Sequence, residues 1–541
     1  MILPLWLGES LSSLLLVAAV ALAAGGPRHR SLASGVPILV LVLHAALYGH
    51  HTVDDAFITF RYADAWESGL GPVYNAGERV EGYTSFAWMA LIAAAGRFGV
   101  DPETAARALG ILFAAACLPA VYRIALRVTG PRAALVAPFA LALSPLFAAW
   151  ACAGMEAPLF ACVIAWTAWA FLGGRALPGG IPLDAAFSGL ALWVRPEGVL
   201  LVAAGVVARL GGPGPARARL AAALRAGLVA IAVAAPYWAW RAIYYGRFFP
   251  NTFYAKFSPA IDLRLATGAR SLFDFAQDLG LGWLGPGLIG ATLLARPGAR
   301  KAYIPLVAGL FMLGAVWTGG DVLHLRVYTH VLPLVAVCLA TGVGALAAGL
   351  APAPGHSHAG AAALAAAIAL AWAGLAFRED ARALRGHDQF GAAYTVGNPR
   401  NLTEVNIPLA GWLRQNVPAG TSLATWDIGA VGYFSRLRVT DCYGLTDAGL
   451  AQLVYHGEPA ARSAEYFERN PPELVAAYAT PDGPALGWLD VDRAWFQHRY
   501  ALHSIWRARS SGYALALFER RGLGLPPPPP AAAVPAEPAD H

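Results

Sequence analysis

Residues 34–62 read SGVPILVLVLHAALYGHHTVDDAFITFRY, an apolar run followed directly by two adjacent aspartates. A helix that spans a bilayer needs about 20 mostly apolar residues, and the run that begins near Ser34 approaches this length. Asp54 and Asp55 therefore stand where the chain leaves the membrane, and an aromatic segment that ends in Arg61 and Tyr62 follows them. This junction predicts a membrane protein whose polar site lies just outside the lipid.

The composition of the whole chain agrees with a polytopic membrane protein. Of the 541 residues, 57% are hydrophobic and 13% are charged, whereas about 25% are charged in an ordinary soluble domain. This apolar surplus is too large for one soluble core, so a soluble protein is excluded. The 39 Lys and Arg residues, against 33 Asp and Glu, fall in short clusters between apolar runs, as in cytoplasmic loops. Nucleic acid is therefore not expected as a partner. The five scattered cysteines have no metal-ligand or redox spacing.

The apolar runs predict about twelve transmembrane helices. They begin near Pro4, Ser34, Thr104, Ala133, Ala157, Ile181, Val199, Ala221, Leu281, Tyr303, Val327 and Gly360. Segment 83–98 is expected to lie at the interface instead, because a span there would place three arginines of the loop after it outside. With this topology the basic loops face the cytoplasm. The acidic loop 51–82, the short loop around Glu156 and the loops 241–256 and 319–329 face outward, and the polar site is expected among them.

The composition changes after about Phe377, where apolar runs shorten and charge rises. We therefore expect a transmembrane domain over residues 1–377, a periplasmic α/β domain over 378–524 and a disordered tail rich in Pro and Ala over 525–541. In the second domain the pattern predicts a helix over 407–415 and strands over 422–427 and 438–442. Gly429 and Gly432 lie in the connection between the two strands.

Asp54 and Asp55 are the strongest candidates for chemistry. Two adjacent carboxylates at a membrane exit repel each other, so one is expected to have a raised pKa or to pair with a cation or a metal ion. A general base meets these conditions. In the alternative interpretation, Asp54 caps a helix that begins at Asp55, and Asp55 interacts with the helix dipole. In that helix Arg61 lies near the same face as Asp54.

Two further polar segments occur before the eighth apolar run. Residues 75–85, NAGERVEGYTS, lead into the expected interfacial helix, and an ordinary amphipathic loop is the alternative interpretation. The segment Arg195-Pro196-Glu197-Gly198 interrupts two short apolar runs, so broken helices around a polar cavity are expected there. The Arg195 guanidinium needs an anion, either Glu197 or a ligand phosphate.

Two more segments lie after that run. Residues 244–256 combine aromatic rings with Arg247 and Lys256, which suits stacking on a sugar and phosphate binding, or an aromatic belt with snorkelling cations. Asp321 and Arg326 stand at the mouth of the next run, where the pair is either structural or in contact with substrate. The chain has no P-loop, Rossmann fingerprint or nucleophile elbow, so nucleotide hydrolysis is not expected.

Taken in order, these segments resemble the polytopic glycosyltransferases of GT-C type. The resemblance is carried by residues 54–62, 75–85, 195–198, 251–256 and 319–321 with Arg326, and more weakly by 427–433 and 441–447. The closest match is to the terminal arabinofuranosyltransferase family of mycobacterial cell-wall synthesis and its bacterial relatives. The resemblance implies a mostly α membrane protein with a C-terminal periplasmic α/β domain.

The implied activity is transfer of a sugar from a polyprenyl-phosphate donor to a cell-envelope glycan or glycolipid acceptor, on the periplasmic face of the inner membrane. Arabinofuranose and other pentoses are candidate sugars. By position, Asp54 is the general base or the carboxylate that orients the acceptor, and Asp55 supports it or binds a divalent cation. The cations expected at the donor phosphate are Arg61, Arg195, Lys256 and Arg326. The residues expected on the acceptor side are Glu81, Tyr83, Glu156 and Asp321.

Other classes of function are open on the sequence alone. One is a transporter or flippase of lipid-linked saccharides, because broken helices also suit transport. Another is a non-enzymatic envelope or motility assembly protein on a degenerate GT-C fold. The acidic pair in an outer loop and the lack of an evident internal repeat favour the enzyme over the transporter. Within the transferases, protein O-mannosylation and lipid A modification are further alternatives.

Overall fold

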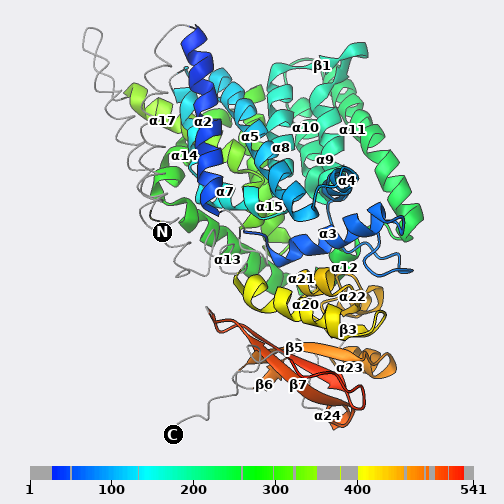
Figure 1. Ribbon diagram of the computed structural model, residues 1–541. Coiled ribbons are helices and arrows are strands. Elements are labelled where there is room, and N and C mark those ends of the chain that lie inside the picture. Colours follow the sequence, from blue (N-terminus) through cyan, green and yellow to red (C-terminus); the bar gives the residue numbers. More distant parts are fainter. Residues whose placement is uncertain are drawn as a thin grey trace.

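The computed structural model contains a helical domain and, beyond one end of it, a C-terminal domain built on a β-sheet (Figure 1). It describes residues 27–48, 51–131, 133–256, 260–296, 298–320, 325–349, 378, 400–455, 460–480, 483–485, 494–509 and 511–528. The predicted spans near Pro4 and Gly360, the expected domain boundary near Phe377 and most of the Pro- and Ala-rich tail lie outside the described residues.

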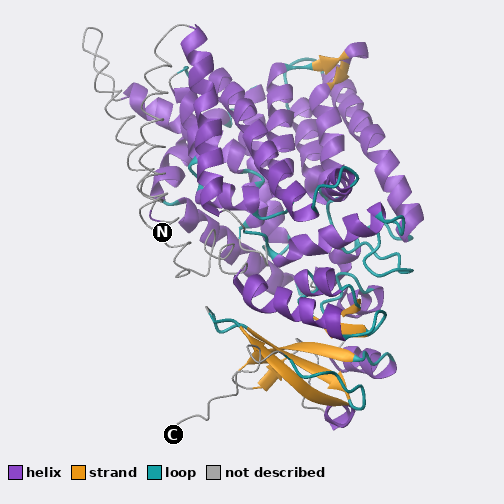
Figure 2. Ribbon diagram, in the orientation of Figure 1, coloured by secondary structure: helices purple, strands orange, loops and turns teal. Residues whose placement is uncertain are grey.

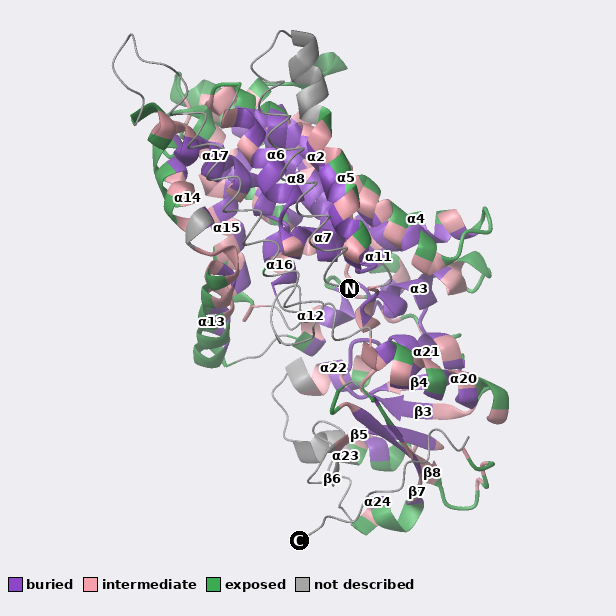
Figure 3. Ribbon diagram, turned by 60° about the vertical axis from the view of Figure 1, so that its left-hand side comes forward, coloured by how far each residue is buried: buried purple, intermediate pink, exposed green. Residues whose placement is uncertain are grey.

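The helical domain is made of apolar helices that pack side by side (Figure 2). Its long helices are α2 (Pro27–Tyr48), α5 (Pro102–Val128), α8 (Ala157–Gly173), α11 (Ala216–Tyr245), α13 (Ile261–Leu279), α14 (Leu281–Leu294), α15 (Tyr303–Trp317) and α17 (Leu332–Gly349). Shorter helices are α6 (Val136–Ala142), α7 (Pro145–Cys152), α9 (Leu183–Val194), α10 (Val199–Leu210), α12 (Asn251–Lys256) and α16 (Arg326–Thr329). Figure 3 shows that buried residues concentrate where these helices meet, whereas α13 is largely exposed.

Among the described residues, few helices are clear membrane spans. By length and composition, three described helices can each cross a membrane, namely α5, α11 and α17, and the bent pair of residues 133–142 with α7 makes a fourth if it is one broken span. Several other apolar helices have only 10–17 residues. The structure therefore does not confirm the count of about twelve.

The break expected around Arg195 is present. Helix α9 ends at Val194, Arg195 has extended backbone angles (φ −151°, ψ 145°), and a short 3-10 turn over Pro196–Gly198 leads into α10. The cause is local, because the ring of Pro196 disfavours helical angles at the residue before it. Helices α9 and α10 have 12 residues each, or about 18 Å of helix, well short of the hydrocarbon thickness.

Several predicted cytoplasmic loops meet at one end of the helical domain. The residues before α9 and after α10 line a common cavity, together with the start of α11 and the loop before α15. The small hairpin of β1 (Ala176–Leu177) and β2 (Ile181–Pro182) marks this end, and α3, α12 and the C-terminal domain lie at the other end (Figure 1). Helices α9 and α10 therefore form a hairpin whose turn, at Arg195, points toward the C-terminal domain.

The acidic pair begins a helix that lies at the end of the bundle facing the C-terminal domain. Helix α3 spans Asp54–Glu67 and packs against α4 (Phe86–Gly96). The structure corrects one expectation, because the N-cap residue is Val53 and Asp54 is the first helical residue. Asp54 does not cap α3, since its carboxylate accepts hydrogen bonds from another part of the chain.

The C-terminal domain is a mixed α/β unit. Its strands are β3 (Ser422–Thr425), β4 (Arg438–Asp441), β5 (Leu474–Thr480), β6 (Gly483–Ala485), β7 (Tyr500–Arg507) and β8 (Ala514–Arg520), in the order β4-β3-β5-β8-β7 with β6 paired to β5. Strand β3 is parallel to β4 and β5, whereas β8 is antiparallel to β5 and β7. Its helices are α20 (Ile407–Asn416), α21 (Ala430–Ser435), α22 (Ala448–Tyr455), α23 (Ala460–Arg469) and α24 (Ala494–Arg499). The predicted helix and the two predicted strands match α20, β3 and β4 to within two residues.

One buried arginine joins α3 to the C-terminal domain. Arg61 donates from Nη1 to the carbonyl oxygen of Gly432 (2.6 Å) and from Nη2 to that of Leu437 (2.7 Å). It also donates to the Tyr74 carbonyl and to Asn75 Oδ1, at 2.7 and 3.1 Å. All four acceptors are uncharged, so the guanidinium joins α3 to residues 74–75, to Gly432 and to Leu437 by hydrogen bonds. Helices α20 and α21 lie between α3 and the sheet (Figure 1).

Candidate active site

The Asp54 carboxylate binds the loop between β3 and α21. Oδ2 accepts a hydrogen bond from the Gly429 amide (3.0 Å), and Oδ1 accepts one from the Ala430 amide (2.8 Å). These amides belong to the first turn of α21, whose unpaired N–H groups favour an anion. A side chain at position 429 would collide with the backbone and carboxylate of Asp54. Glycine is therefore required for this close approach.

The surroundings of Asp54 favour its protonated form. Burial and the nearby carboxylate of Asp427 raise the pKa of Asp54 to about 8, against the opposing effect of the two amide hydrogen bonds. Asp427 itself accepts hydrogen bonds from the hydroxyls of Tyr478 (2.7 Å) and Tyr513 and from the Asn406 amide (3.4 Å). Burial also raises the pKa of Asp427. A carboxylate of the C-terminal domain thus lies beside the acidic pair.

Asp55 differs from Asp54 in having no hydrogen bond or ion pair with any described residue. It is partly exposed and lies one residue into α3. Both Asp54 and Asp427 interact electrostatically with it. Of the two adjacent aspartates, Asp55 is therefore the one whose oxygens are available to a substrate.

Residues 153–156 connect this acidic region with a group of buried arginines. The Val53 amide, just before α3, donates to the Ala153 carbonyl (3.2 Å), and the indole of Trp88 on α4 donates to the Gly154 carbonyl (3.0 Å). The next two residues, Met155 and Glu156, contact Arg326 and Arg195. Four consecutive residues thus hold the start of α3 beside both arginines.

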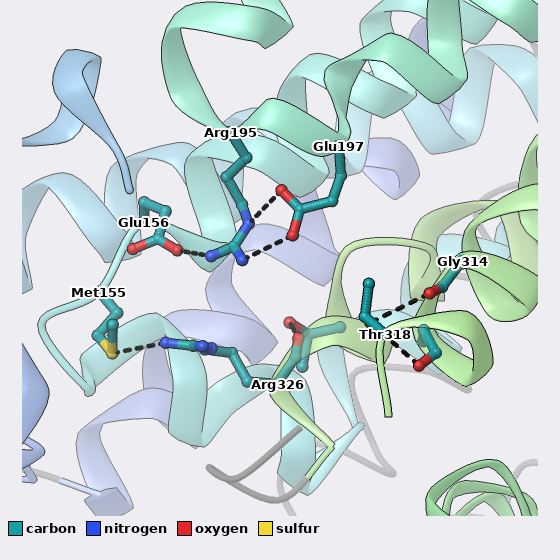
Figure 4. A network of polar contacts seen from close by, with 9 residues as sticks. Met155, Glu156, Arg195, Glu197, Gly314, Thr318 and Arg326 are labelled. Atoms are coloured by element: carbon teal, nitrogen blue, oxygen red, sulfur yellow. Dashed lines mark hydrogen bonds and ion pairs between the residues drawn. The ribbon is translucent and has the colours of Figure 1, made fainter. Parts of the chain in front are cut away.

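Arg195 lies between two glutamates (Figure 4). Its Nη1 pairs with Glu156, and its Nη2 and Nε pair with the two oxygens of Glu197 at 2.9 and 3.3 Å. The side chains of Arg195 and Glu156 are only 6% and 3% exposed, whereas that of Glu197 is 38% exposed. The structural alternative for the segment, a pair of Arg195 with Glu197, is thus present, and Glu156 is a second partner.

Arg326 is the other cation of this group. It begins α16 and is buried, and its Nη1 lies 3.3 Å from the sulfur of Met155. The structure thus brings Glu156, Arg195 and Arg326 together around the segment 153–156, and the Val53–Ala153 hydrogen bond joins that segment to the residue before α3. Lys256 is exposed at the end of α12. Arg61 is not part of this group, because its guanidinium binds the C-terminal domain. Asp321 lies outside the described residues.

Glu81 and Tyr83 pack against α11. The Glu81 carboxylate pairs with Arg241 Nε (2.5 Å) and accepts from the Tyr237 hydroxyl (3.1 Å). Burial raises the pKa of Glu81, and the Arg241 charge opposes that rise. The Tyr83 hydroxyl lies 3.0 Å from that of Tyr245. Both side chains thus hold the loop before α4 on α11.

The residues at the acidic pair fit a metal ion poorly. Both oxygens of Asp54 face backbone N–H groups, which repel a cation. In the part of the chain that the structure describes, no group of three or more His, Cys, Asp or Glu side chains could hold a metal ion. The divalent cation expected at Asp54 and Asp55 stays a prediction, and no chemical step is assigned to it.

Sequence reasoning missed two components of the site. Asp427 belongs to a motif of the C-terminal domain that carries the resemblance only weakly, and of residues 153–156 the sequence indicates only Glu156, as a candidate on the acceptor side. Both positions lie in short connections between apolar elements, and this is the only feature of the sequence that marks them. Their proximity to Asp54 and Arg326 arises from contacts between elements far apart in the sequence.

Comparisons with known proteins agree with this architecture. Residues 85–240 match the family described as dolichyl-phosphate-mannose-protein mannosyltransferase, and residues 398–518 match a domain of unknown function, DUF8728. A terminal beta-(1->2)-arabinofuranosyltransferase of Corynebacterium glutamicum is 28% identical over 339 residues, which are 54% of this chain and 47% of that protein. The chain thus spans about half the length of this curated relative.

Two solved structures share the fold. ArnT from Cupriavidus metallidurans, bound to undecaprenyl phosphate, has a TM-score of 0.57 at 14% identity and covers 91% of this chain and 98% of its own. The archaeal oligosaccharyltransferase AglB from Archaeoglobus fulgidus has a TM-score of 0.54 at 12% identity and covers 87% and 79%. The chain is therefore a mostly helical membrane protein with the GT-C fold. The resemblance to GT-C glycosyltransferases that the sequence motifs indicate is confirmed.

Proposed function

We propose that the protein is a membrane glycosyltransferase that moves a sugar from a polyprenyl-phosphate donor to a cell-envelope glycan or glycolipid. The observation that carries the proposal is the segment 153–156, which contacts two buried arginines and the residue before α3. Asp55, Arg195 and Arg326 therefore lie at the same end of the bundle, the end that faces the C-terminal domain. Transfer from a lipid phosphate needs a base for the acceptor hydroxyl and positive charge for the departing phosphate. This group of residues supplies both.

Asp55 is the proposed general base. A base must reach the acceptor hydroxyl, and the oxygens of Asp55 have no partner among the described residues, whereas both oxygens of Asp54 are held by amides of the C-terminal domain. Asp54 is then a positioning residue that fixes the start of α3. The resemblance instead made Asp54 the general base or the carboxylate that orients the acceptor, with Asp55 in support.

Arg326 is the proposed principal ligand of the donor phosphate. A guanidinium can bind two phosphate oxygens at once, and the charge on those oxygens grows as the glycosidic bond breaks. Arg195 is already paired with two carboxylates, so it is assigned to holding Glu156 and Glu197 in place and to adding positive charge. Lys256, at the exposed end of α12, is assigned to the headgroup region rather than to the reacting phosphate.

The reaction balances without a nucleotide. The acceptor oxygen forms a bond to the anomeric carbon, the bond from that carbon to the phosphate oxygen breaks, and the acceptor proton passes to Asp55. The leaving group is polyprenyl phosphate. A pentose such as arabinofuranose is proposed as the sugar, supported by the relative from Corynebacterium glutamicum, and the periplasmic face of the inner membrane as the location. The exported position of the C-terminal domain follows from the same topology.

The proposal is tested by incubating the purified protein with polyprenyl-phosphate pentoses and hexoses, using envelope extract as acceptor, and measuring release of polyprenyl phosphate. Wild type should release it from one class of donor, and Arg326→Gln should raise the KM for that donor. An Arg469→Gln control removes an exposed charge far from the site and should change neither constant. Binding of a donor without release, or its transfer across vesicles, would favour the flippase instead.

A further inference from the structure

A large cavity lies at the end of the helical domain that faces away from the C-terminal domain. Its volume is about 800 Å³, within the usual range for small-molecule sites. The end of α8, the β1–β2 hairpin, the end of α10, the start of α11 and the start of α15 surround it. It is separated from Arg195 by the length of α9, about 18 Å. It is therefore distinct from the candidate active site.

The charged lining of this cavity is strongly basic. Arg175, Arg209, Arg219 and Arg300 line it, together with one carboxylate, that of Asp184. Arg209 Nη2 donates hydrogen bonds to both oxygens of the Asp184 carboxylate, at 3.0 and 2.9 Å. The other three guanidinium groups form no ion pair with any described residue. An excess of three positive charges around one cavity favours an anion.

One of these arginines has a buried nitrogen with no hydrogen-bond partner among the described residues. The Nη1 of Arg219 donates to the Gly212 carbonyl over 3.4 Å, and its buried Nε–H donates to no acceptor among the described residues. A buried guanidinium nitrogen without an acceptor costs free energy, and such groups are rare in native proteins. An anionic oxygen in the cavity would satisfy it.

The rest of the lining is apolar, which restricts the kind of anion. Phe171, Val207, Tyr303 and Leu306 line the same space as the arginines. Val207 is 52% exposed, and Leu220 and Leu224 on the adjacent start of α11 are 51% and 58% exposed. In a membrane these side chains face lipid. A small soluble anion would leave the apolar wall in water, whereas an amphipathic ligand covers it.

We infer that this cavity binds the phosphodiester headgroup of an anionic membrane lipid. Arg175, Arg219 and Arg300 bind the phosphate oxygens, and the apolar wall contacts the glycerol and the first carbons of the acyl chains. Guanidinium groups suit this ligand because they bind phosphate oxygens in pairs. Basic pockets between membrane helices are a known means of holding such headgroups. The site binds this lipid in the surrounding leaflet and takes no part in sugar transfer.

The test uses the full-length protein in detergent, with cardiolipin, phosphatidylglycerol, phosphatidylcholine and inorganic phosphate as separate probes. Native mass spectrometry measures the lipid that stays bound. Wild type should retain the two anionic lipids and not phosphatidylcholine. The double variant Arg175→Gln/Arg300→Gln should bind them about 30-fold more weakly, from the usual contribution of two such charges. Both arginines are exposed, so the variant should melt like wild type.

A matched control removes the same number of charges elsewhere. Arg270→Gln/Arg469→Gln changes two arginines whose side chains are 70% and 73% exposed, each in a pair along its own helix. It should retain anionic lipid as wild type does. Equal loss in the two double variants, or equal binding of phosphatidylcholine, would overturn the inference. Full displacement of lipid by millimolar phosphate would also overturn it, because the site would then take a soluble anion.

Discussion

Replacement of Arg61 by methionine should release the C-terminal domain from α3. Methionine keeps much of the length and apolar character of the side chain but removes every donor. Two of the four hydrogen bonds of Arg61 reach the C-terminal domain, at the carbonyls of Gly432 (2.6 Å) and Leu437 (2.7 Å). A hydrogen bond from a charged donor contributes about 1.5–3 kcal/mol, so the two together stabilise the contact by about 3–6 kcal/mol.

Hydrogen exchange read by mass spectrometry measures this loss directly. Amides in segment 428–440 should exchange at least about 100-fold faster in Arg61→Met than in wild type, if exchange follows opening of the contact. Amides of α5 and α17 should keep their protection, because those helices lie in the core of the helical domain.

Arg436→Met is the matched control, because Arg436 also joins the C-terminal domain to α3. It pairs with Asp64 (2.7 Å), but its side chain is 44% exposed, so its removal should cost about 1 kcal/mol or less. The reasoning is refuted if both variants speed exchange equally, or if Arg61→Met leaves segment 428–440 as protected as in wild type.

Three other predictions follow from the same contacts. Gly429→Ala places a methyl group against Asp54 and should destabilise the folded protein by about 1–3 kcal/mol in chemical denaturation. The control is Gly411→Ala, whose methyl group meets nothing within 4 Å and should stabilise α20 by up to about 1 kcal/mol. Equal effects of the two substitutions would contradict the close approach of Gly429 to Asp54. The pKa of Asp54 is about 8 in the folded protein, above its unfolded value of 3.8, so its contribution to stability is full below about pH 4 and is lost as the pH rises toward 8. As the pH rises from 5 to 8, the denaturation midpoint of wild type should therefore fall relative to that of Asp54→Asn. A difference between the two midpoints that does not change with pH would count against the raised pKa. To test the topology, a membrane-impermeant maleimide should label Ser68→Cys in intact cells and Arg217→Cys only after permeabilisation. The background should be low because all five native cysteines are buried. The reverse labelling pattern would contradict the proposed orientation.

Features that depend on local chemistry could be predicted from the sequence. The start of α3 near the acidic pair, the break of helix before Pro196 and the strands β3 and β4 each follow from residues that are neighbours in the chain. The anion needed by Arg195 was also foreseen, with Glu197 as one of two alternatives. Glu156, the second partner, lies 39 residues away, and no local pattern indicates such a pair.

Features that depend on the packing of distant elements could not be predicted. Asp54 binds backbone amides and Arg61 binds backbone carbonyls more than 370 residues away, and backbone donors and acceptors are not visible in a sequence. The pattern therefore placed Arg61 with the donor phosphate and Asp54 at a helix cap or as the base. The number of spans is not confirmed, because several described apolar helices are too short to cross a membrane by length alone.

The central claim is that Asp55 acts as the base and Asp54 positions it. The most direct test is the kcat of Asp55→Asn at saturating donor, beside Asp54→Asn and wild type, with donor Kd measured on the same samples. Loss of a general base should lower kcat about 10²- to 10⁴-fold in Asp55→Asn, with little change in donor Kd, while Asp54→Asn keeps more activity. An Asp55→Asn variant that turns over like wild type, or a larger loss of kcat in Asp54→Asn, would contradict the assignment.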